Sequence, residues 1–231
     1  MCPTPPAQLP SPTTTTSPTQ ASKSHVPCTP ISTAAFEHAA ALLAPAILNH
    51  SMRVYLYASA LATHTSSIYS SNSAQHDLLF TACLFHDLGT CSAHDSGTQR
   101  FEVEGANAAV EFLRRYDAVS EAERHAVWTA IACHTSPHIA EGIGELARLV
   151  RVGVVVDFGR GEGVAGREVL EGLREGLERE FGREGIEKVL GDAVVRQAAA
   201  RPEKAPMVSW PGVLYRAWRE EPEWEGVNKM F

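Results

Sequence analysis

The chain has 231 residues, of which 44% are hydrophobic and 20% are charged, a balance typical of one globular domain with a sizeable core. Its formal net charge of −7 argues against general binding to nucleic acid or anionic membranes, since both need a positive surface that attracts phosphate groups. No apolar run approaches the roughly 18 residues of a membrane helix, and the N-terminus lacks a signal-peptide pattern. The five cysteines form no C-x-x-C pair and indicate a reducing compartment, so we expect a cytoplasmic protein.

The first 30 residues differ in composition from the rest of the chain. They contain eight of the fourteen prolines and only Leu9 and Val26 as large aliphatic residues. Such a segment cannot bury enough apolar surface to offset the entropy lost on ordering. We therefore predict a disordered tail over residues 1–30 and one helical catalytic domain over residues 31–231.

The domain is predicted to be an all-α bundle. Helices are expected, in chain order, over residues 36–48, 50–63, 74–89, 104–116, 120–134, 145–158, 170–181 and 186–195, followed by an aromatic C-terminal segment. Pro45 predicts a break or kink, Gly89 a left-handed C-terminal stop, and Ser120 with Glu123 a capping box. The run 150–156 has strand composition as well, but the surrounding helices favour a helix there.

Several polar residues continue apolar helix faces. His50, His134 and Asp157 do so, and a buried imidazole or carboxylate is costly unless it is paired, hydrogen-bonded or bound to a metal. For any one of these histidines, a hydrogen-bonded core residue is the simpler explanation. Together, however, His50, His86, Asp87 and Asp157 supply two imidazoles and two carboxylates from three helices, a donor set that suits a divalent transition metal. The adjacent His86 and Asp87 point about 100° apart on a helix, so both reach one ion only beside the end of that helix.

These residues resemble the H…HD…D signature of the HD-domain superfamily, whose members are all-helical metal-dependent enzymes, mostly phosphohydrolases. Their local context more narrowly resembles the fungal cyanamide hydratase family. The stretches that carry this second resemblance are residues 50–55, 84–90, 100–106, 130–135 and 152–159.

The resemblance implies a zinc ion held by His50, His86, Asp87 and Asp157, although Fe²⁺ or Mn²⁺ would also suit these donors. It further implies a hydro-lyase (a carbon-oxygen lyase) that acts on cyanamide, a small neutral nitrile. Zinc with an open position generates hydroxide near neutral pH. Our hypothesis is that this hydroxide attacks the nitrile carbon, giving an isourea that tautomerises to urea.

The reaction also needs groups that orient the amine and deliver a proton. The resemblance places Glu102 facing the pocket, where it could serve in catalysis and substrate binding, with Asp87 and His134 as further catalytic groups. The alternative for Glu102 is a carboxylate favoured by the helix macrodipole. His134 and Thr135 are candidates for orienting the substrate, and a structural role for both is the alternative.

Two other functions stay open at this stage. A phosphohydrolase of nucleotides or other phosphate esters would need basic side chains converging on the metal, and Arg53, Arg148 and Arg151 are the candidates; Arg53 could instead pair with an acidic neighbour. A non-catalytic scaffold would be expected to have lost a ligand, and this chain keeps all four. The aromatic C-terminal segment is compatible with a homo-oligomer interface.

Overall fold

The computed structural model describes residues 23–160 and 166–221, which contain helices and no strand. This confirms the predicted all-α class. The α-helices are α2 (Pro30–Leu42), α3 (Pro45–His64), α4 (Ile68–Ser71), α5 (Ser73–Phe85), α6 (Phe101–Leu113), α7 (Glu121–Cys133), α8 (Ile139–Ile143), α9 (Glu145–Asp157), α10 (Arg167–Glu180), α11 (Ile186–Ala200) and α12 (Trp210–Glu220). Three short 3-10 helices are η1 (Leu88–Thr90), η2 (Ser92–His94) and η3 (Pro202–Lys204).

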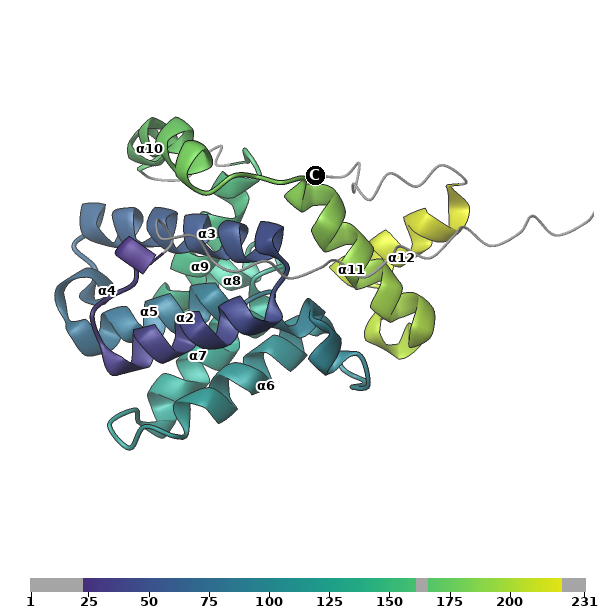
Figure 1. The fold of residues 1–231 in the computed structure, drawn as a ribbon, viewed down its shortest axis with the longest axis horizontal. Helices are drawn as coiled ribbons and strands as arrows, with labels where there is room; N and C mark the ends of the chain where they lie inside the picture. The colour runs from purple at the N-terminus through teal and green to yellow at the C-terminus, as the bar shows by residue number, and fades with distance from the viewer. Residues whose placement is uncertain (1–22, 161–165, 222–231) are drawn as a thin grey trace, which may run out of the picture.

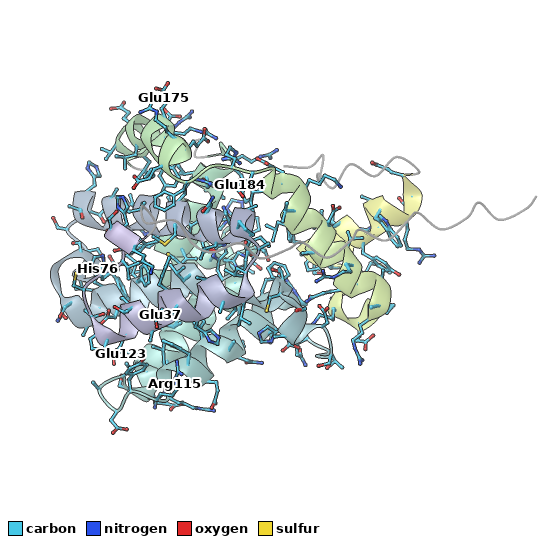
Figure 2. The ribbon with its side chains drawn as sticks, viewed as in Figure 1. Glu37, His76, Arg115, Glu123, Glu175 and Glu184 are labelled. Atoms are coloured by element: carbon cyan, nitrogen blue, oxygen red, sulfur yellow. The ribbon has the colours of Figure 1, made fainter. Side chains whose placement is uncertain are left out.

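Helix α3 packs against α5 and α9, and α6 packs along α7 (Figure 1). Helix α10 lies across α3, and α11 and α12 pair beside the bundle. Charged side chains such as Glu37, Arg115 and Glu175 lie on the outside (Figure 2). None of the described helices has both the length and the apolar character needed to cross a membrane.

Local sequence signals account for several helix boundaries. Pro45 occupies the first turn of α3, so the predicted break is confirmed, since proline suits a helix start and disfavours a helix interior. Ser120 and Glu123 form the predicted reciprocal capping box at the start of α7. The valine-rich segment forms α9, so the helical alternative to a strand is confirmed.

The prediction for Gly89 was wrong. Helix α5 ends earlier, at Phe85, and Gly89 lies in η1 without a left-handed conformation. A Cβ atom at this position would lie 2.0 Å from the backbone oxygen of Phe101, so the glycine is required by close contact with the start of α6. This contact brings the segment that carries Glu102 close to the end of α5.

A second close approach joins α3 to α9. A Cβ atom on Gly153 would lie 2.6 Å from the backbone oxygen of Val54, so the two helices cross nearly backbone to backbone. His50 lies one turn before Val54 and Asp157 one turn after Gly153. The crossing therefore places these two side chains next to each other.

The described residues include the last part of the predicted tail, residues 23–30. Thr29 caps α2, and the Thr29 hydroxyl also donates to Asp77. Val26 packs against the main core. The remainder of the predicted tail, residues 1–22, lies outside the described residues. At the other end of the chain, part of the expected aromatic segment forms α12, whose Leu214 and Trp218 are buried.

Candidate metal centre

Three buried donor groups meet between α3 and the end of α5. The Nε2 atoms of His50 and His86 lie 3.2 Å apart. The Oδ2 atom of Asp87 lies 3.1 Å from Nε2 of His86 and 3.6 Å from Nε2 of His50. His50 and His86 are 0% exposed and Asp87 is 1% exposed. These donor atoms lie within 4.8 Å of one another, so a single metal ion could bind all three.

The end of α5 explains how two adjacent residues reach one point. His86 is the C-cap of α5, and Asp87 has left the helical conformation, with φ −104° and ψ 5°. The turn that follows redirects the Asp87 carboxylate toward the His86 ring. His134 stands at the equivalent position, as the C-cap of α7, and Asp157 is the last residue of α9. The carboxyl ends of three helices therefore meet here, and their partial negative charge favours a cation.

The hydrogen bonds of the imidazoles leave Nε2 facing the centre. Nδ1 of His86 donates to the backbone oxygen of Cys83 at 2.7 Å, and Nδ1 of His134 donates to that of Ile131, also at 2.7 Å. Nε2 of His134 then lies 3.5 Å from Oδ1 of Asp87. Oδ2 of Asp87 is buried without a hydrogen bond from any described residue. Such an atom, beside two converging Nε2 atoms, fits a bound metal cation.

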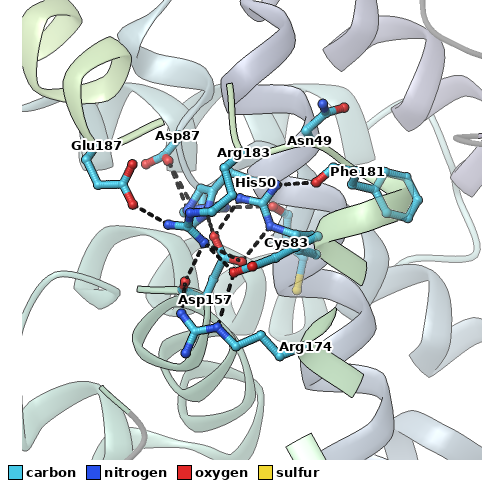
Figure 3. A network of polar contacts seen from close by, with 12 residues as sticks. Asn49, His50, Cys83, Asp87, Asp157, Arg174, Phe181, Arg183 and Glu187 are labelled. Atoms are coloured by element: carbon cyan, nitrogen blue, oxygen red, sulfur yellow. Dashed lines mark hydrogen bonds and ion pairs between the residues drawn. The ribbon is translucent and has the colours of Figure 1, made fainter. Parts of the chain in front are cut away.

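Asp157 lies on the other side of His50. Its Oδ2 accepts a hydrogen bond from Nδ1 of His50 at 2.7 Å. Arg53 donates from Nε to Oδ1 at 2.6 Å and from Nη2 to Oδ2 at 2.8 Å, and Arg183 contacts the Asp157 backbone oxygen at 2.9 Å (Figure 3). Of the four expected ligands, His50, His86 and Asp87 converge on one point. The Asp157 carboxylate instead accepts a hydrogen bond from the opposite nitrogen of the His50 ring and fixes the orientation of that ring. Arg53 pairs with an acidic neighbour, one of its two predicted alternatives.

Burial and neighbouring charges shift the pKa values of the donor groups. Burial alone would lower the pKa of His86, but Asp87 outweighs that effect and raises it. Burial lowers the pKa of His50 despite its hydrogen bond to Asp157. Burial alone would raise the pKa values of Asp87 and Asp157. The pKa of Asp87 nevertheless lies well below its ordinary value because of the neighbouring His86, and that of Asp157 does so because of Arg53 and His50. Both carboxylates are therefore ionised, the form in which a carboxylate binds a metal ion.

Glu102 is placed differently from the prediction. It is 0% exposed, and its Oε1 accepts hydrogen bonds from the Thr135 hydroxyl at 2.7 Å and from Arg100 Nη2 at 2.5 Å. Among the described residues that line the cavity, Thr135 is present and Glu102 is not. Thr135 thus lies between Glu102 and the cavity, and its hydroxyl donates a hydrogen bond to Glu102. The catalytic and substrate-binding roles expected for Glu102 would therefore act through Thr135.

A cavity of about 250 Å³ opens beside the donor group. His50, His86, Asp87, His134 and Thr135 form its polar end. The other lining residues are Pro137, Val154, Val155, Phe158, Leu190, Trp210 and two arginines, Arg151 and Arg160.

Sequence reasoning missed two groups of residues around this centre. Arg100 donates to Glu102, and Arg183 donates to the backbone oxygen of Asp157. Nothing in the local sequence of either arginine indicates these partners. The apolar lining contributed by Leu190 and Trp210 comes from helices far along the chain, so local periodicity could show only that these residues were buried.

Comparison with known families identifies the domain. The model of the HD domain matches residues 47–174, which is more than half of the chain. This range contains all four residues of the predicted metal set. No curated protein matches the chain at the level of sequence. HD domains bind divalent metals, and this one presents a buried His-His-Asp group suited to a metal-dependent enzyme. The chain therefore belongs to the HD-domain family.

Proposed function

We propose that this protein is a metal-dependent hydro-lyase that adds water to the nitrile of cyanamide and gives urea. The observation that carries the proposal is the buried group of His50, His86 and Asp87 at the polar end of a cavity. The choice of a nitrile is supported by the resemblance of the sequence around these residues to cyanamide hydratases. The reaction consumes one water and one cyanamide, and it forms a carbon–oxygen bond while the nitrile nitrogen gains two protons.

His50, His86 and Asp87 would hold the metal, with Asp157 and Arg53 fixing the ring of His50 from behind. We propose zinc, and Fe²⁺ or Mn²⁺ would suit the same nitrogen and oxygen donors. A divalent ion with an open position lowers the pKa of a coordinated water from 15.7 to about 7, which supplies a nucleophile at neutral pH.

Thr135 and Glu102 would orient the substrate. The hydroxyl of Thr135 donates its hydrogen to Glu102, and its oxygen accepts a hydrogen bond from Nη2 of Arg100 at 3.3 Å. One lone pair of this oxygen is therefore left for the cavity that Thr135 lines. Such an oxygen accepts a hydrogen bond from the amino group of cyanamide. Glu102 is then a positioning residue, because it fixes the direction of the Thr135 hydroxyl.

His134 would move the proton. Nδ1 of His134 donates to the backbone oxygen of Ile131, which leaves Nε2 as an acceptor beside Asp87. His134 lines the cavity, so Nε2 can accept a proton from the attacking water and return it to the nitrile nitrogen.

A phosphohydrolase is the second candidate, and one observation favours it: Arg151 and Arg160 line the cavity. Of the other candidate cations, Arg53 is fully buried against Asp157, and Arg148 is not part of the described lining. Arg151 is paired with Glu141 and Arg160 is exposed to solvent, an arrangement less suited to a phosphate group than arginines that converge on it for bidentate contacts.

The test is urea release from cyanamide by zinc-loaded protein, compared with His86→Ala and with His125→Ala, an exposed histidine, as control. We expect urea from the wild type and from the control, and none above background from His86→Ala. If zinc-loaded wild-type protein releases no urea, the nitrile proposal is wrong. Phosphate release from nucleotides by the same sample would then support the second candidate.

A further inference from the structure

The cavity is larger than cyanamide needs. Its volume is about 250 Å³, whereas an apolar cavity of about 150 Å³ is enough to bind benzene. The space beside the donor group can therefore hold a ring of that size and still leave roughly 100 Å³ for a small reacting group. Cyanamide has only three non-hydrogen atoms and would leave most of the cavity filled with water.

The wall beyond the donor group is apolar. Phe158, at the end of α9, places its ring 4.9 Å from the ring of His50, measured between centroids. Leu190 on α11 is 4% exposed, and Val154 on α9 is 9% exposed. Trp210, at the start of α12, lines the same space and packs against Phe101 at 5.7 Å. Such a wall binds an alkyl or aryl group through burial of apolar surface.

The cations of the cavity do not favour an anionic group. Nε of Arg151 lies 3.2 Å from the carboxylate of Glu141, and Nη1 of Arg151 donates to the backbone oxygen of His134 at 3.1 Å. Its charge is compensated within the protein. Arg160 is exposed to solvent, where an ion pair contributes little.

We propose that the substrate is a substituted cyanamide whose amino nitrogen carries an apolar group about the size of one aromatic ring. The nitrile lies at the polar end of the cavity, and the ring lies against Phe158, Leu190 and Trp210. The inference rests on the proposed function for the chemistry of the nitrile. Water adds across the carbon–nitrogen triple bond of R–NH–C≡N and gives the urea R–NH–CO–NH₂, with both water hydrogens ending on the former nitrile nitrogen and no change of oxidation state.

Binding without turnover tests the apolar wall. Hydroxamates bind metal ions, so acetohydroxamate and benzohydroxamate share the same metal-binding end and differ in the apolar group. Calorimetry on zinc-loaded protein is expected to show about tenfold to hundredfold tighter binding of benzohydroxamate, because a phenyl group becomes buried. Equal affinities in the wild type would overturn the proposal without reference to any variant.

A matched pair of substitutions locates the effect. Leu190→Trp fills the cavity and should reduce the ratio of the two affinities at least about fivefold. Leu173→Trp makes the same change on α10, where the side chain is 37% exposed, and should leave the ratio unchanged. A ratio that stays the same in Leu190→Trp would contradict the proposed position of the ring.

Turnover separates this inference from the proposed function. We expect kcat/KM for phenylcyanamide to exceed that for cyanamide by about tenfold or more. Hydration of cyanamide without a preference for the phenyl compound would refute the inference and leave the proposed function standing. If benzohydroxamate binds more tightly but neither nitrile is hydrated, the proposed function and the substituted-cyanamide substrate both fail, while the apolar wall is supported.

Discussion

Arg53 provides the sharpest test of how the centre is held together. Its side chain is 0% exposed and donates two hydrogen bonds to Asp157, at 2.6 and 2.8 Å. Nη1 of Arg53 also donates to the backbone oxygens of Phe181 at 2.8 Å and Gly182 at 3.2 Å. Arg53→Met keeps much of the side-chain volume and removes all of these donors. Asp157 would then be a buried carboxylate that keeps, among the described residues, one side-chain hydrogen bond, from His50, and the more distant charge of Arg183, whose Nη1 lies 3.8 Å from Oδ1.

Removing one partner of a buried ion pair costs about 3–5 kcal/mol, because the other charge stays buried without compensation. With a urea dependence of about 2 kcal/mol/M, the unfolding midpoint of Arg53→Met should fall by roughly 2 M. Arg53→Met combined with Asp157→Asn removes both charges and keeps an acceptor for Nδ1 of His50. The double variant should therefore recover at least half of the lost free energy of unfolding.

The measurement is urea unfolding of metal-free protein, followed by circular dichroism. Arg114→Met is the control, because Arg114 forms an exposed ion pair with Glu111 at 3.2 Å. Such pairs contribute less than about 1 kcal/mol, so this control should unfold near the wild-type midpoint. If Arg53→Met unfolds within about 1 kcal/mol of the wild type, or if the double variant is less stable than Arg53→Met, the reasoning about Asp157 is wrong.

Three further outcomes follow from the same contacts. Glu102→Gln should lower kcat for urea formation about tenfold or more while zinc stays bound, because Thr135 loses a charged acceptor. The control is Glu104→Gln, in the same turn of α6 at a residue outside the described cavity lining, and an unchanged kcat in Glu102→Gln would count against the positioning role. Gly153→Ala should destabilise the protein by about 1–3 kcal/mol, since the new Cβ would lie 2.6 Å from a backbone oxygen of α3. A midpoint of urea unfolding equal to that of the wild type would argue against the close crossing of α3 and α9. Folding lowers the pKa of Asp157, so the ionised carboxylate stabilises the protein above the unfolded pKa of about 3.9, and this stabilisation is lost as the pH falls below that value. Metal-free Asp157→Asn should therefore lose less free energy of unfolding between about pH 5 and pH 3 than the wild type does. Equal losses in the two proteins would contradict the role of Asp157.

Local sequence was enough to predict most helices and the donor group. The helical register of α9 and the capping box at Ser120 depend on neighbouring residues, and both are confirmed. His86 and Asp87 are adjacent in sequence, so their shared position needed only the end of α5 nearby. The approach of His50 followed from its place on an apolar helix face.

Longer-range packing explains what the sequence did not show. Gly89 serves a contact with Phe101 on another helix, which no turn signal reveals. Glu102 faces Thr135 and Arg100 because of how α6 packs beside α7. Asp157 lies beside His50 because it binds Arg53 and because α3 crosses α9. Arg53 and Asp157 are 104 positions apart, so the local sequence gives no sign that they pair.

Metal content per chain is the most direct test of the centre itself. Purified wild-type protein, His86→Ala, Asp157→Asn and the exposed control His125→Ala are incubated with zinc, desalted and measured by elemental analysis. We expect one zinc ion per chain in the wild type and the control, and no zinc in His86→Ala. Asp157→Asn should bind zinc more weakly and still reach one ion per chain at high zinc concentration, because His50, His86 and Asp87 remain. Full zinc content in desalted His86→Ala would contradict the assignment of the metal to these three residues.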